Sequence, residues 1–320
     1  MASGKGLSLM SGGLDSQLAI SILERAGAYM EAICFSSPFF DSSSAEKAAA
    51  ALGVKLHIVD FTADEIALIK SPAHGFGGAM NPCIDCHALM IRRAGELMAR
   101  LGFDFVSTGE VMGQRPMSQN RQSLGIVERE SGLKGRLVRP LSAKLLEPTI
   151  PELEGLIDRE KLLDISGRCR DRQIALAKEF GIVDYPSPAG GCKLTEAGFC
   201  RKLKDLMDHE GLDNRGLTEL LTVGRRFRLP GGAGVILGRD SKENSILAER
   251  SSLGVLIAPT NVPGPTALVT SLNADVDMEL VKGLVCSYSH YNRLEGDIEL
   301  NVGIVKRPYL REQYKEYQIC

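Results

Sequence analysis

Tryptophan is absent from this chain, and aromatic residues make up only 5% of its 320 positions. Proteins that stack nucleic-acid bases on an aromatic platform need more such side chains, so we expect no such platform here. Lysine and arginine number 38 against 40 aspartates and glutamates, which gives a formal net charge of −2. This balance excludes a uniformly basic coat for nucleic acid, although local basic patches remain compatible with it.

Long apolar runs are also missing. No uninterrupted apolar stretch approaches the ~20 residues of a membrane-spanning helix. The first residues lack the basic segment, apolar region and cleavage site of a secretory signal. We therefore expect a cytoplasmic protein, and the length of the chain is sufficient for two domains with separate cores.

A glycine-rich turn near the N-terminus organises the first part of the chain. Residues 6–10 form a short apolar run typical of a buried strand, and apolar residues at helical spacing follow from residue 14 onward. The two glycines of the turn let the backbone bend sharply and bring its N–H groups close to an anion at the start of a helix. A carboxylate in such a turn suits a magnesium-bound pyrophosphate better than a bare phosphate. The candidate nucleotide-binding residues are Ser11, Gly12, Gly13, Leu14, Asp15 and Ser16.

Strand and helix patterns alternate over the first hundred residues. Strands are predicted at residues 30–35, 54–59 and 103–107, and helices at 45–52, 62–69 and 88–101. This alternation predicts an α/β fold with a doubly wound parallel sheet, in which ligands bind beyond the carboxyl ends of the strands. Three further residues are expected at that edge: Phe35 beside the adenine, and Thr108 and Gly109 beside the nucleotide.

The C-terminal part predicts a second, smaller α+β domain. Residues 224–239 have the pattern of a hairpin, residues 254–257, 267–270 and 298–305 that of strands, and residues 277–287 that of a helix. We therefore expect two domains, at residues 1–205 and 206–320.

Three of the eight cysteines occur where chemistry is expected. Cys83 and Cys86 form a C-x-x-C motif at the start of a helix, and Cys192 follows a loop rich in proline and glycine. A thiol at a helix N-terminus is expected to have a lowered pKa. Three thiolates are compatible with an open-sited 4Fe–4S cluster or with a persulfide carrier and a resolving cysteine. A zinc site would need a fourth ligand, for which His87 is the candidate.

A basic segment occupies residues 111–144. It contains seven lysines and arginines but only two glutamates, and we expect it to contact phosphate or RNA. Its basic residues are Arg115, Arg121, Arg129, Lys134, Arg136, Arg139 and Lys144.

These stretches together resemble the PP-loop ATP pyrophosphatases, and among them the tRNA thiolation enzymes. The hexapeptide at residues 11–16 has the family's SGGxDS pattern. The nearest relatives in pattern are the MnmA-type 2-thiouridylases and the ThiI-type 4-thiouridine synthases, over roughly residues 1–200. The C-terminal module resembles the NFACT-R-like RNA-binding domain. The other stretches that carry the resemblance are Asn81 to His87, Ser107 to Glu110, Arg139 to Leu141 and Gly190 to Cys192.

The resemblance implies an enzyme that uses ATP and magnesium to adenylate a carbonyl oxygen of a tRNA base and then replaces that oxygen with sulfur. Asp15 would help to place the magnesium, and Cys83, Cys86 and Cys192 would carry the sulfur chemistry or ligate a metal. A C-x-x-C with a distant third cysteine is closer to the cluster-dependent thiolases, which favours a 4Fe–4S cluster over a persulfide pair, and either over zinc. The implied partners are tRNA and a sulfur donor: a cysteine desulfurase, a sulfur carrier or free sulfide.

Two alternatives remain open on the sequence. One is a PP-loop enzyme that acts on a small carboxylate, as amide-forming relatives do, which would leave the cysteine set without a role. The other is a nucleotide- and RNA-binding iron–sulfur protein without turnover.

Overall fold

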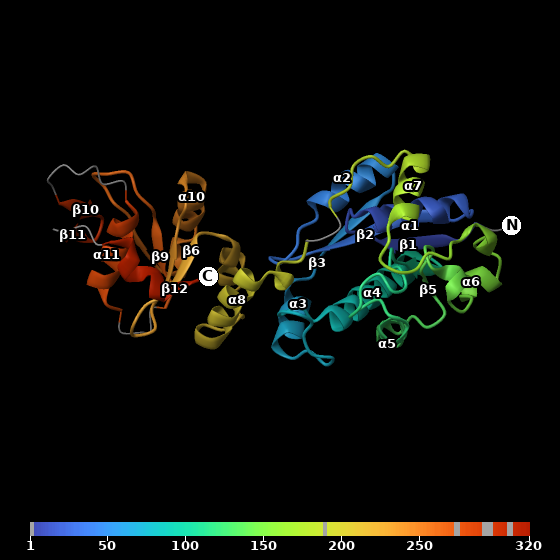
Figure 1. The fold of residues 1–320 in the computed structure, drawn as a ribbon, viewed down its shortest axis with the longest axis horizontal. Coiled ribbons are helices and arrows are strands. Elements are labelled where there is room, and N and C mark those ends of the chain that lie inside the picture. The colour runs from blue at the N-terminus through green and yellow to red at the C-terminus, as the bar shows by residue number, and fades with distance from the viewer. Residues whose placement is uncertain (1–2, 188–190, 272–275, 290–296, 306–309) are drawn as a thin grey trace. The chain divides into compact units, whose positions relative to one another are not determined.

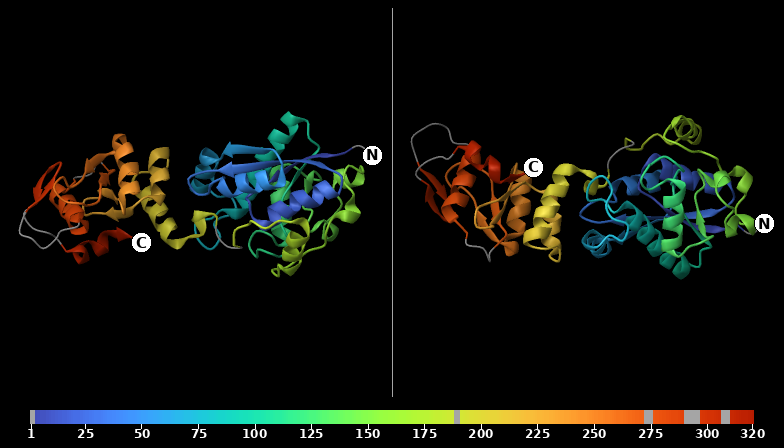
Figure 2. Two further views of the ribbon diagram at one scale, coloured as in Figure 1. Left: turned by 90° about the horizontal axis from the view of Figure 1, so that it is seen from above. Right: turned by 60° about the horizontal axis from the view of Figure 1, so that its bottom comes forward.

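The computed structural model describes residues 3–187, 191–271, 276–289, 297–305 and 310–320. The chain divides into two compact units, Met1–Thr195 and Glu196–Cys320, each with its own sheet (Figures 1 and 2). The expected boundary between residues 205 and 206 falls inside helix α8 (Ala197–His209), which belongs to the second unit.

The sheet of the first unit has five parallel strands in the order β3-β2-β1-β4-β5, which confirms the predicted α/β class. The short β5 lies within the predicted basic segment and was not expected as a strand. The strands are β1 (Lys5–Leu9), β2 (Tyr29–Ser36), β3 (Leu56–Asp60), β4 (Phe105–Ser107) and β5 (Leu137–Val138).

Helices cover both faces of this sheet because its strands are apolar on both sides. On β2, Ala32 and Cys34 belong to one core cluster, whereas Ile33 and Phe35 belong to the other. The first cluster packs against α1 (Leu14–Arg25), α2 (Ser43–Leu52) and α7 (Asp171–Phe180) (Figure 1). The second packs against α3 (Thr62–Lys70), α4 (Cys83–Leu101) and α5 (Arg121–Ser131), and the short α6 (Ile150–Leu153) follows β5.

The direction of strand addition reverses at β1. Strands β2 and β3 are added on one side of it and β4 and β5 on the other, so the loops after β1 and β4 leave the same edge on either side of this reversal. Such a switch point is where open α/β sheets bind their ligands. The glycine-rich turn follows β1, so the topology places it there.

The sheet of the second unit is antiparallel, in the order β12-β6-β7-β9-β8. One face packs against α11 (Met278–Tyr288) and the other against α10 (Ser241–Glu249), because alternate residues of β7 point to opposite sides. The strands are β6 (Arg225–Arg228), β7 (Gly234–Leu237), β8 (Val255–Ile257), β9 (Ala267–Val269) and β12 (Gln318–Ile319), with a separate hairpin β10 (Ile298–Leu300) and β11 (Gly303–Val305) and the short α9 (Arg215–Glu219).

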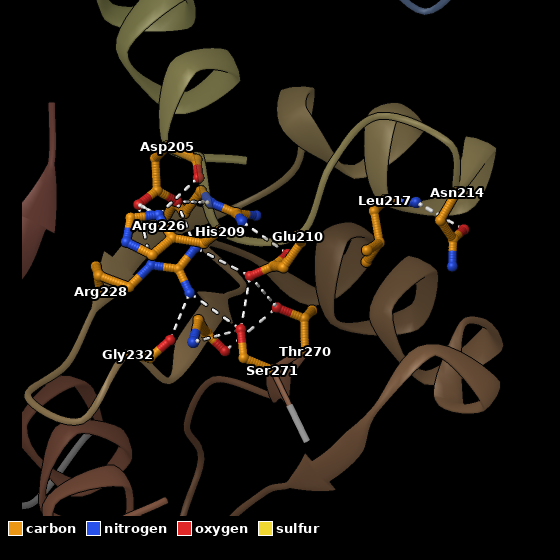
Figure 3. Close-up of polar contacts among 11 residues, drawn as sticks. Asp205, His209, Glu210, Asn214, Leu217, Arg226, Arg228, Gly232, Thr270 and Ser271 are labelled. Atoms are coloured by element: carbon orange, nitrogen blue, oxygen red, sulfur yellow. Dashed lines mark hydrogen bonds and ion pairs between the residues drawn. The ribbon is translucent and has the colours of Figure 1, made fainter. Parts of the chain in front are cut away.

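A buried ion-pair network attaches α8 to this sheet (Figure 3). Asp205 Oδ2 lies 2.6 Å from Arg226 Nε and 2.8 Å from Arg228 Nη2. Glu210, directly after α8, pairs with the same two arginines at 3.0 and 2.9 Å. Because two carboxylates balance two guanidinium groups, these arginines are structural, and their pairing explains why α8 belongs to the second unit.

None of the helices in the described parts of the chain is both long and apolar enough to cross a membrane.

Candidate nucleotide and sulfur site

The glycine-rich turn after β1 is held in a conformation that requires glycine. Gly12 has φ +77°, and a Cβ atom at this position would lie 2.4 Å from the backbone carbonyl of Ser44 at the start of α2. Two side chains close the turn: Ser16 Oγ donates to the Gly13 carbonyl at 2.8 Å, and Gln17 Nε2 donates to the Gly12 carbonyl at 2.9 Å. The turn is therefore rigid before any ligand binds.

The N-terminus of α1 is open to an anion. Its N-cap residue is Gly13, and no side chain caps the helix. The first N–H groups of a helix carry a partial positive charge and lack partners within the helix. Leu14 is buried in the core, so its contribution to binding is limited to its backbone N–H. The loop is suited to holding phosphate oxygens through its backbone.

The loop after β4 contacts this turn directly. A Cβ atom on Gly109 would lie 2.6 Å from the backbone carbon of Asp15 and from the backbone nitrogen of Ser16. Thr108 is buried, and its hydroxyl donates to Glu110 Oε2 at 3.1 Å. Gly109 thus packs against the glycine-rich turn, whereas the Thr108 hydroxyl is used inside the protein.

Asp15 presents a carboxylate at this junction. Its Oδ2 accepts a hydrogen bond from Gln114 Nε2 at 3.0 Å and lies 4.0 Å from Arg170 Nη2. Its Oδ1 is buried and has no hydrogen-bond partner among the described residues. An unsatisfied carboxylate oxygen of this kind fits a magnesium ligand.

Sequence reasoning missed both Gln114 and Arg170 as site residues. Both reach Asp15 from positions far along the chain. Arg170 precedes α7, and its Nε is also buried without a partner in the described part of the chain. The three arginines at residues 168, 170 and 172 are the signal in the sequence that could have found Arg170.

Phe35 lies near the end of β2 as predicted, but its side chain is turned into the core. Only 5% of it is exposed, and its ring packs 5.2 Å from that of Phe61 in the core beneath α4. Alternation along β2 turns this side chain toward the helical layer and away from the loops. The Phe35 side chain is therefore occupied in the core, and the expected contact with the adenine stays a prediction for its backbone.

The three predicted cysteines lie in the first unit, two of them in the first turn of α4. Cys86 is influenced by the charges of both Cys83 and Cys192, although Cys192 is more than a hundred positions away in the chain. Asn81 Nδ2 donates to Cys83 Sγ at 3.0 Å. Gly190, part of the motif before Cys192, lies outside the described residues.

The expected lowering of the thiol pKa at the helix N-terminus is wrong for Cys86. Burial raises the pKa of Cys86 well above its usual range, because desolvation disfavours the thiolate. Nearby acidic groups raise it further: the carboxyl groups of Glu65 and Asp85 and the thiols of Cys83 and Cys192.

The arrangement of the cysteines does not form a metal site as it stands. In the described ranges, no group of three or more histidine, cysteine, aspartate or glutamate side chains is placed to hold a metal ion. His87, the candidate fourth zinc ligand, has its Nδ1 3.0 Å from Glu110 Oε1. The remaining cysteines are buried or exposed singly: Cys34, Cys200 and Cys286 are buried, and Cys169 and Cys320 are exposed.

Glu110 joins the start of α4 to the loop after β4. Besides His87, it pairs with Arg139 at 2.9 Å, and both charges are buried. Burial by itself raises the pKa of Glu110, but Arg139 and His87 outweigh it and hold this pKa at about 2. Cys86, His87, Glu110, Gly109 and Asp15 thus form a continuous connection from the cysteines to the glycine-rich turn.

The basic segment is less available to phosphate than its composition predicted. Arg139 is only 3% exposed and pairs with Glu110 and Glu128. Arg136 and Arg121 donate to backbone carbonyls. The segment folds into α5 and β5, and several of its arginines are bonded to other groups of the protein in this fold.

Glu65, on α3, is a fully buried carboxyl group close to Cys86. Ser37 Oγ donates to its Oε2 at 2.5 Å, and its Oε1 has no partner among the described residues. Burial raises the pKa of Glu65 from 4.5 to about 7, although the Ser37 bond lowers it. The neutral form is therefore favoured by the fold, and its contribution to stability is lost as pH rises from about 4.5 through 7.

A Glu65→Gln variant is expected to be more stable than the parent chain at pH 8, by up to about 3 kcal/mol, and equally stable near pH 5. Glutamine keeps an acceptor for Ser37 but cannot ionise. Urea unfolding between pH 5 and pH 8 measures this, with the exposed Glu154→Gln as the matched control. If Glu65→Gln and Glu154→Gln lose the same unfolding free energy between pH 5 and pH 8, the raised pKa of Glu65 is contradicted.

Both parts of the chain match known protein families. Residues 1–144 match the family model described as thiamine biosynthesis protein (ThiI), and residues 224–316 match that of the NFACT protein RNA-binding domain. The predicted resemblances of both parts are thereby confirmed.

Several individual proteins are similar to parts of this chain. The tRNA-specific 2-thiouridylase MnmA of Roseiflexus sp. is 24% identical over 294 residues, covering 78% of this chain and 75% of that protein. A probable tRNA sulfurtransferase of Anoxybacillus flavithermus is 30% identical over 134 residues, covering 39% of this chain but only 32% of its own length. A 4-thiouridine synthetase solved with RNA and ATP aligns with a TM-score of 0.41 and 21% identity, over 68% of this chain and 52% of that one.

Proposed function

We propose that this chain, a relative of the PP-loop tRNA thiolation enzymes, is an ATP-dependent tRNA sulfurtransferase that forms a thiouridine. It adenylates a carbonyl oxygen of the base and replaces that oxygen with sulfur. The observation that carries the proposal is the connection of the C-x-x-C end of α4 to the glycine-rich turn, through the His87–Glu110 contact and the packing of Gly109 on Asp15. A tRNA substrate would place the protein in the cytoplasm.

The glycine-rich turn and the N-terminus of α1 hold the ATP phosphates. Asp15, with its unsatisfied Oδ1, is the residue that would hold magnesium, and Gln114 fixes the orientation of its carboxylate. When bound, magnesium neutralises charge on the departing pyrophosphate. Arg170, close to Asp15, supplies a second positive charge at this point.

Adenylation makes a poor electrophile reactive. The base oxygen attacks the α-phosphorus of ATP, pyrophosphate leaves, and the base carbon then carries an AMP leaving group. A terminal persulfide sulfur on one cysteine attacks that carbon, and AMP departs with the oxygen. A second cysteine then attacks the sulfur atom of the cysteine that carried the persulfide. This releases the base as a thiocarbonyl and leaves a disulfide between the two cysteines, which an external thiol reduces.

The cysteines Cys83, Cys86 and Cys192 are the residues for these sulfur steps. Three thiolates are the donor set of an open-sited 4Fe–4S cluster, but the described side chains are not arranged around a metal, and we assign no step to a cluster. Iron and sulfide analysis of anaerobically purified protein tests this point separately. A cysteine desulfurase or a sulfur carrier would supply sulfur at the persulfide level. Free sulfide would serve by attacking the cysteine disulfide left by the preceding turnover, which gives one persulfide and one thiol.

The direct test is tRNA-dependent exchange of pyrophosphate into ATP. We expect exchange with the parent chain and a loss of about 10²-fold or more in Asp15→Asn, because asparagine keeps the shape but not the charge that magnesium needs. Asp164→Asn, an exposed aspartate at the surface, is the matched control and should retain exchange.

The outcome also separates the alternatives. Exchange that depends on a small carboxylate in place of tRNA would identify an amide-forming enzyme. Absence of any exchange, with tRNA still bound, would identify a binding protein without turnover. Mass spectrometry of nucleosides from thiolated tRNA then gives the modified base.

A further inference from the structure

A pocket in the second unit is used by none of the steps above. It has a volume of about 320 Å³, within the range of ligand-binding pockets. Its walls come from the start of β6, the turn between β7 and α10, the proline-rich loop before β9, the end of α11 and the 3₁₀ helix Arg311–Tyr317. Its cationic members are Arg225, Arg239 and Arg311, against a single carboxylate from Asp240.

Two of these cations are held in place without being neutralised. The guanidinium carbons of Arg225 and Arg311 lie 5.1 and 4.6 Å from the ring centroid of Tyr288, over the ring. Arg311 Nε donates to the Ser287 carbonyl at 3.0 Å. Within the part of the chain that the structure covers, neither guanidinium pairs with a carboxylate. An aromatic ring orients arginine but leaves its charge available.

The other charges of the pocket are already engaged. Arg239 pairs with Glu243 of α10. Asp240 caps α10, because its Oδ1 accepts the Glu243 N–H at 2.9 Å. The net attraction for an anion therefore comes from Arg225 and Arg311.

The opposite wall is rigid. Asn244 Oδ1 accepts the Thr266 N–H at 2.9 Å, and its Nδ2 donates to the Gly264 carbonyl at 3.3 Å. A Cβ atom on Gly238 would lie 2.1 Å from Asn244 Oδ1, so a side chain at this position would displace the Asn244 amide from its two hydrogen bonds. The pocket keeps its shape without a ligand.

We propose that this pocket binds the phosphodiester backbone of RNA, with Arg225 and Arg311 as the phosphate-contacting residues. Arginine presents several donors in a planar fork that matches phosphate oxygens. The neighbouring hairpin arginines, Arg226 and Arg228, are excluded from this role by their buried pairs with Asp205 and Glu210 (Figure 3). The choice of RNA as the source of the phosphate rests on the match of residues 224–316 to the NFACT RNA-binding domain, which does not say which residues contact RNA. The inference rests on the proposed function in taking this RNA to be tRNA.

The test measures binding of an unmodified tRNA transcript to the full chain without ATP, as a function of KCl concentration. The Arg225→Ala/Arg311→Ala variant is expected to bind about tenfold or more weakly at 0.15 M salt, and its plot of log affinity against log salt should be shallower by about 2. Arg201→Ala/Arg250→Ala removes two exposed arginines of the same unit outside the pocket, and should leave the slope nearly unchanged. An equal effect of both double variants would overturn the proposal.

Variants of Tyr288 give a second test of the same pocket. Tyr288→Phe keeps the ring and should bind tRNA like the parent chain, whereas Tyr288→Ala frees the two guanidinium groups and should weaken binding. Thermal unfolding checks each variant, because Tyr288 also packs 6.0 Å from Phe227. Arg311→Ala alone, at an exposed position, should still lower the salt slope by about 1 if the double variant fails to fold.

Competition identifies the source of the phosphate. AMP and inorganic phosphate are each titrated against the tRNA complex, and millimolar concentrations should displace little of it. Tight AMP binding that the double variant loses, with tRNA binding unchanged, would make this a mononucleotide pocket and overturn the proposal. If the double variant binds tRNA as tightly as the parent chain and still exchanges pyrophosphate, the pocket proposal fails and the proposed function stands. If tRNA binding depends on the pocket but the parent chain shows no exchange, the proposed function fails and the pocket proposal stands.

Discussion

A Cys192→Ser variant is expected to lose tRNA thiolation by about 10³-fold or more while retaining tRNA-dependent pyrophosphate exchange. The serine hydroxyl cannot carry a persulfide or close a disulfide with a second cysteine. The adenylation step, in contrast, depends on the glycine-rich turn and Asp15, which the substitution leaves intact. Mass spectrometry of nucleosides from tRNA incubated with ATP and a sulfur source measures the first quantity, and radiolabelled pyrophosphate measures the second.

The matched control for this experiment is Cys169→Ser. Cys169 is exposed and lies beside Arg170, so it tests whether any cysteine near the site suffices. We expect Cys169→Ser to thiolate normally, and Cys83→Ser and Cys86→Ser to behave like Cys192→Ser. Full thiolation by the Cys192 variant would show that sulfur transfer does not pass through this cysteine, and loss of exchange would show that its role is structural.

A Glu110→Gln variant is expected to lose about 3–5 kcal/mol of unfolding free energy at pH 7, because it leaves Arg139 charged and buried without its principal partner. The pKa of Glu110 is lowered from 4.5 to about 2 in the folded chain, so its contribution is present above about pH 4.5 and lost as pH falls toward 2. The difference between variant and parent should therefore shrink below pH 4.5. Urea unfolding at pH 7 and pH 3 measures both effects.

Glu128→Gln is the control for this pair. Glu128 also approaches Arg139, at 3.3 Å, but it is partly exposed, and its loss should cost no more than about 1 kcal/mol. Glu110→Gln/Arg139→Met removes both buried charges and should recover part of the stability. A Glu110→Gln chain as stable as Glu128→Gln would contradict the assignment.

Local signals were enough for much of the first unit. The pattern of strand, two glycines and helix specifies a turn that only a few backbone conformations satisfy, and the parallel sheet follows from the alternation of strands and helices. The pairing of a C-x-x-C at a helix start with a distant cysteine was also visible. The short β5 and α10 were not predicted, because two or three apolar residues in a polar segment carry little periodicity.

Individual side chains were harder to place than elements. Phe35 was assigned to the adenine from its position at a strand end, but the direction of a side chain on a strand depends on register, which the sequence does not state. The basic residues at 111–144 were counted as available charge, and yet Arg139 is buried against Glu110. Whether a charge faces solvent or a partner depends on which segments pack against it.

The sequence by itself determined the glycine-rich turn, the three cysteines and the two kinds of domain, because each of these is encoded in neighbouring residues and their spacing. Only the tertiary structure decided that Gly109 packs on Asp15, that Arg170 and Gln114 reach the same carboxylate, and that burial raises the pKa of the Cys86 thiol. Those properties arise from desolvation and from contacts between residues far apart in the chain, and neither is present until the sheet and its helices have assembled.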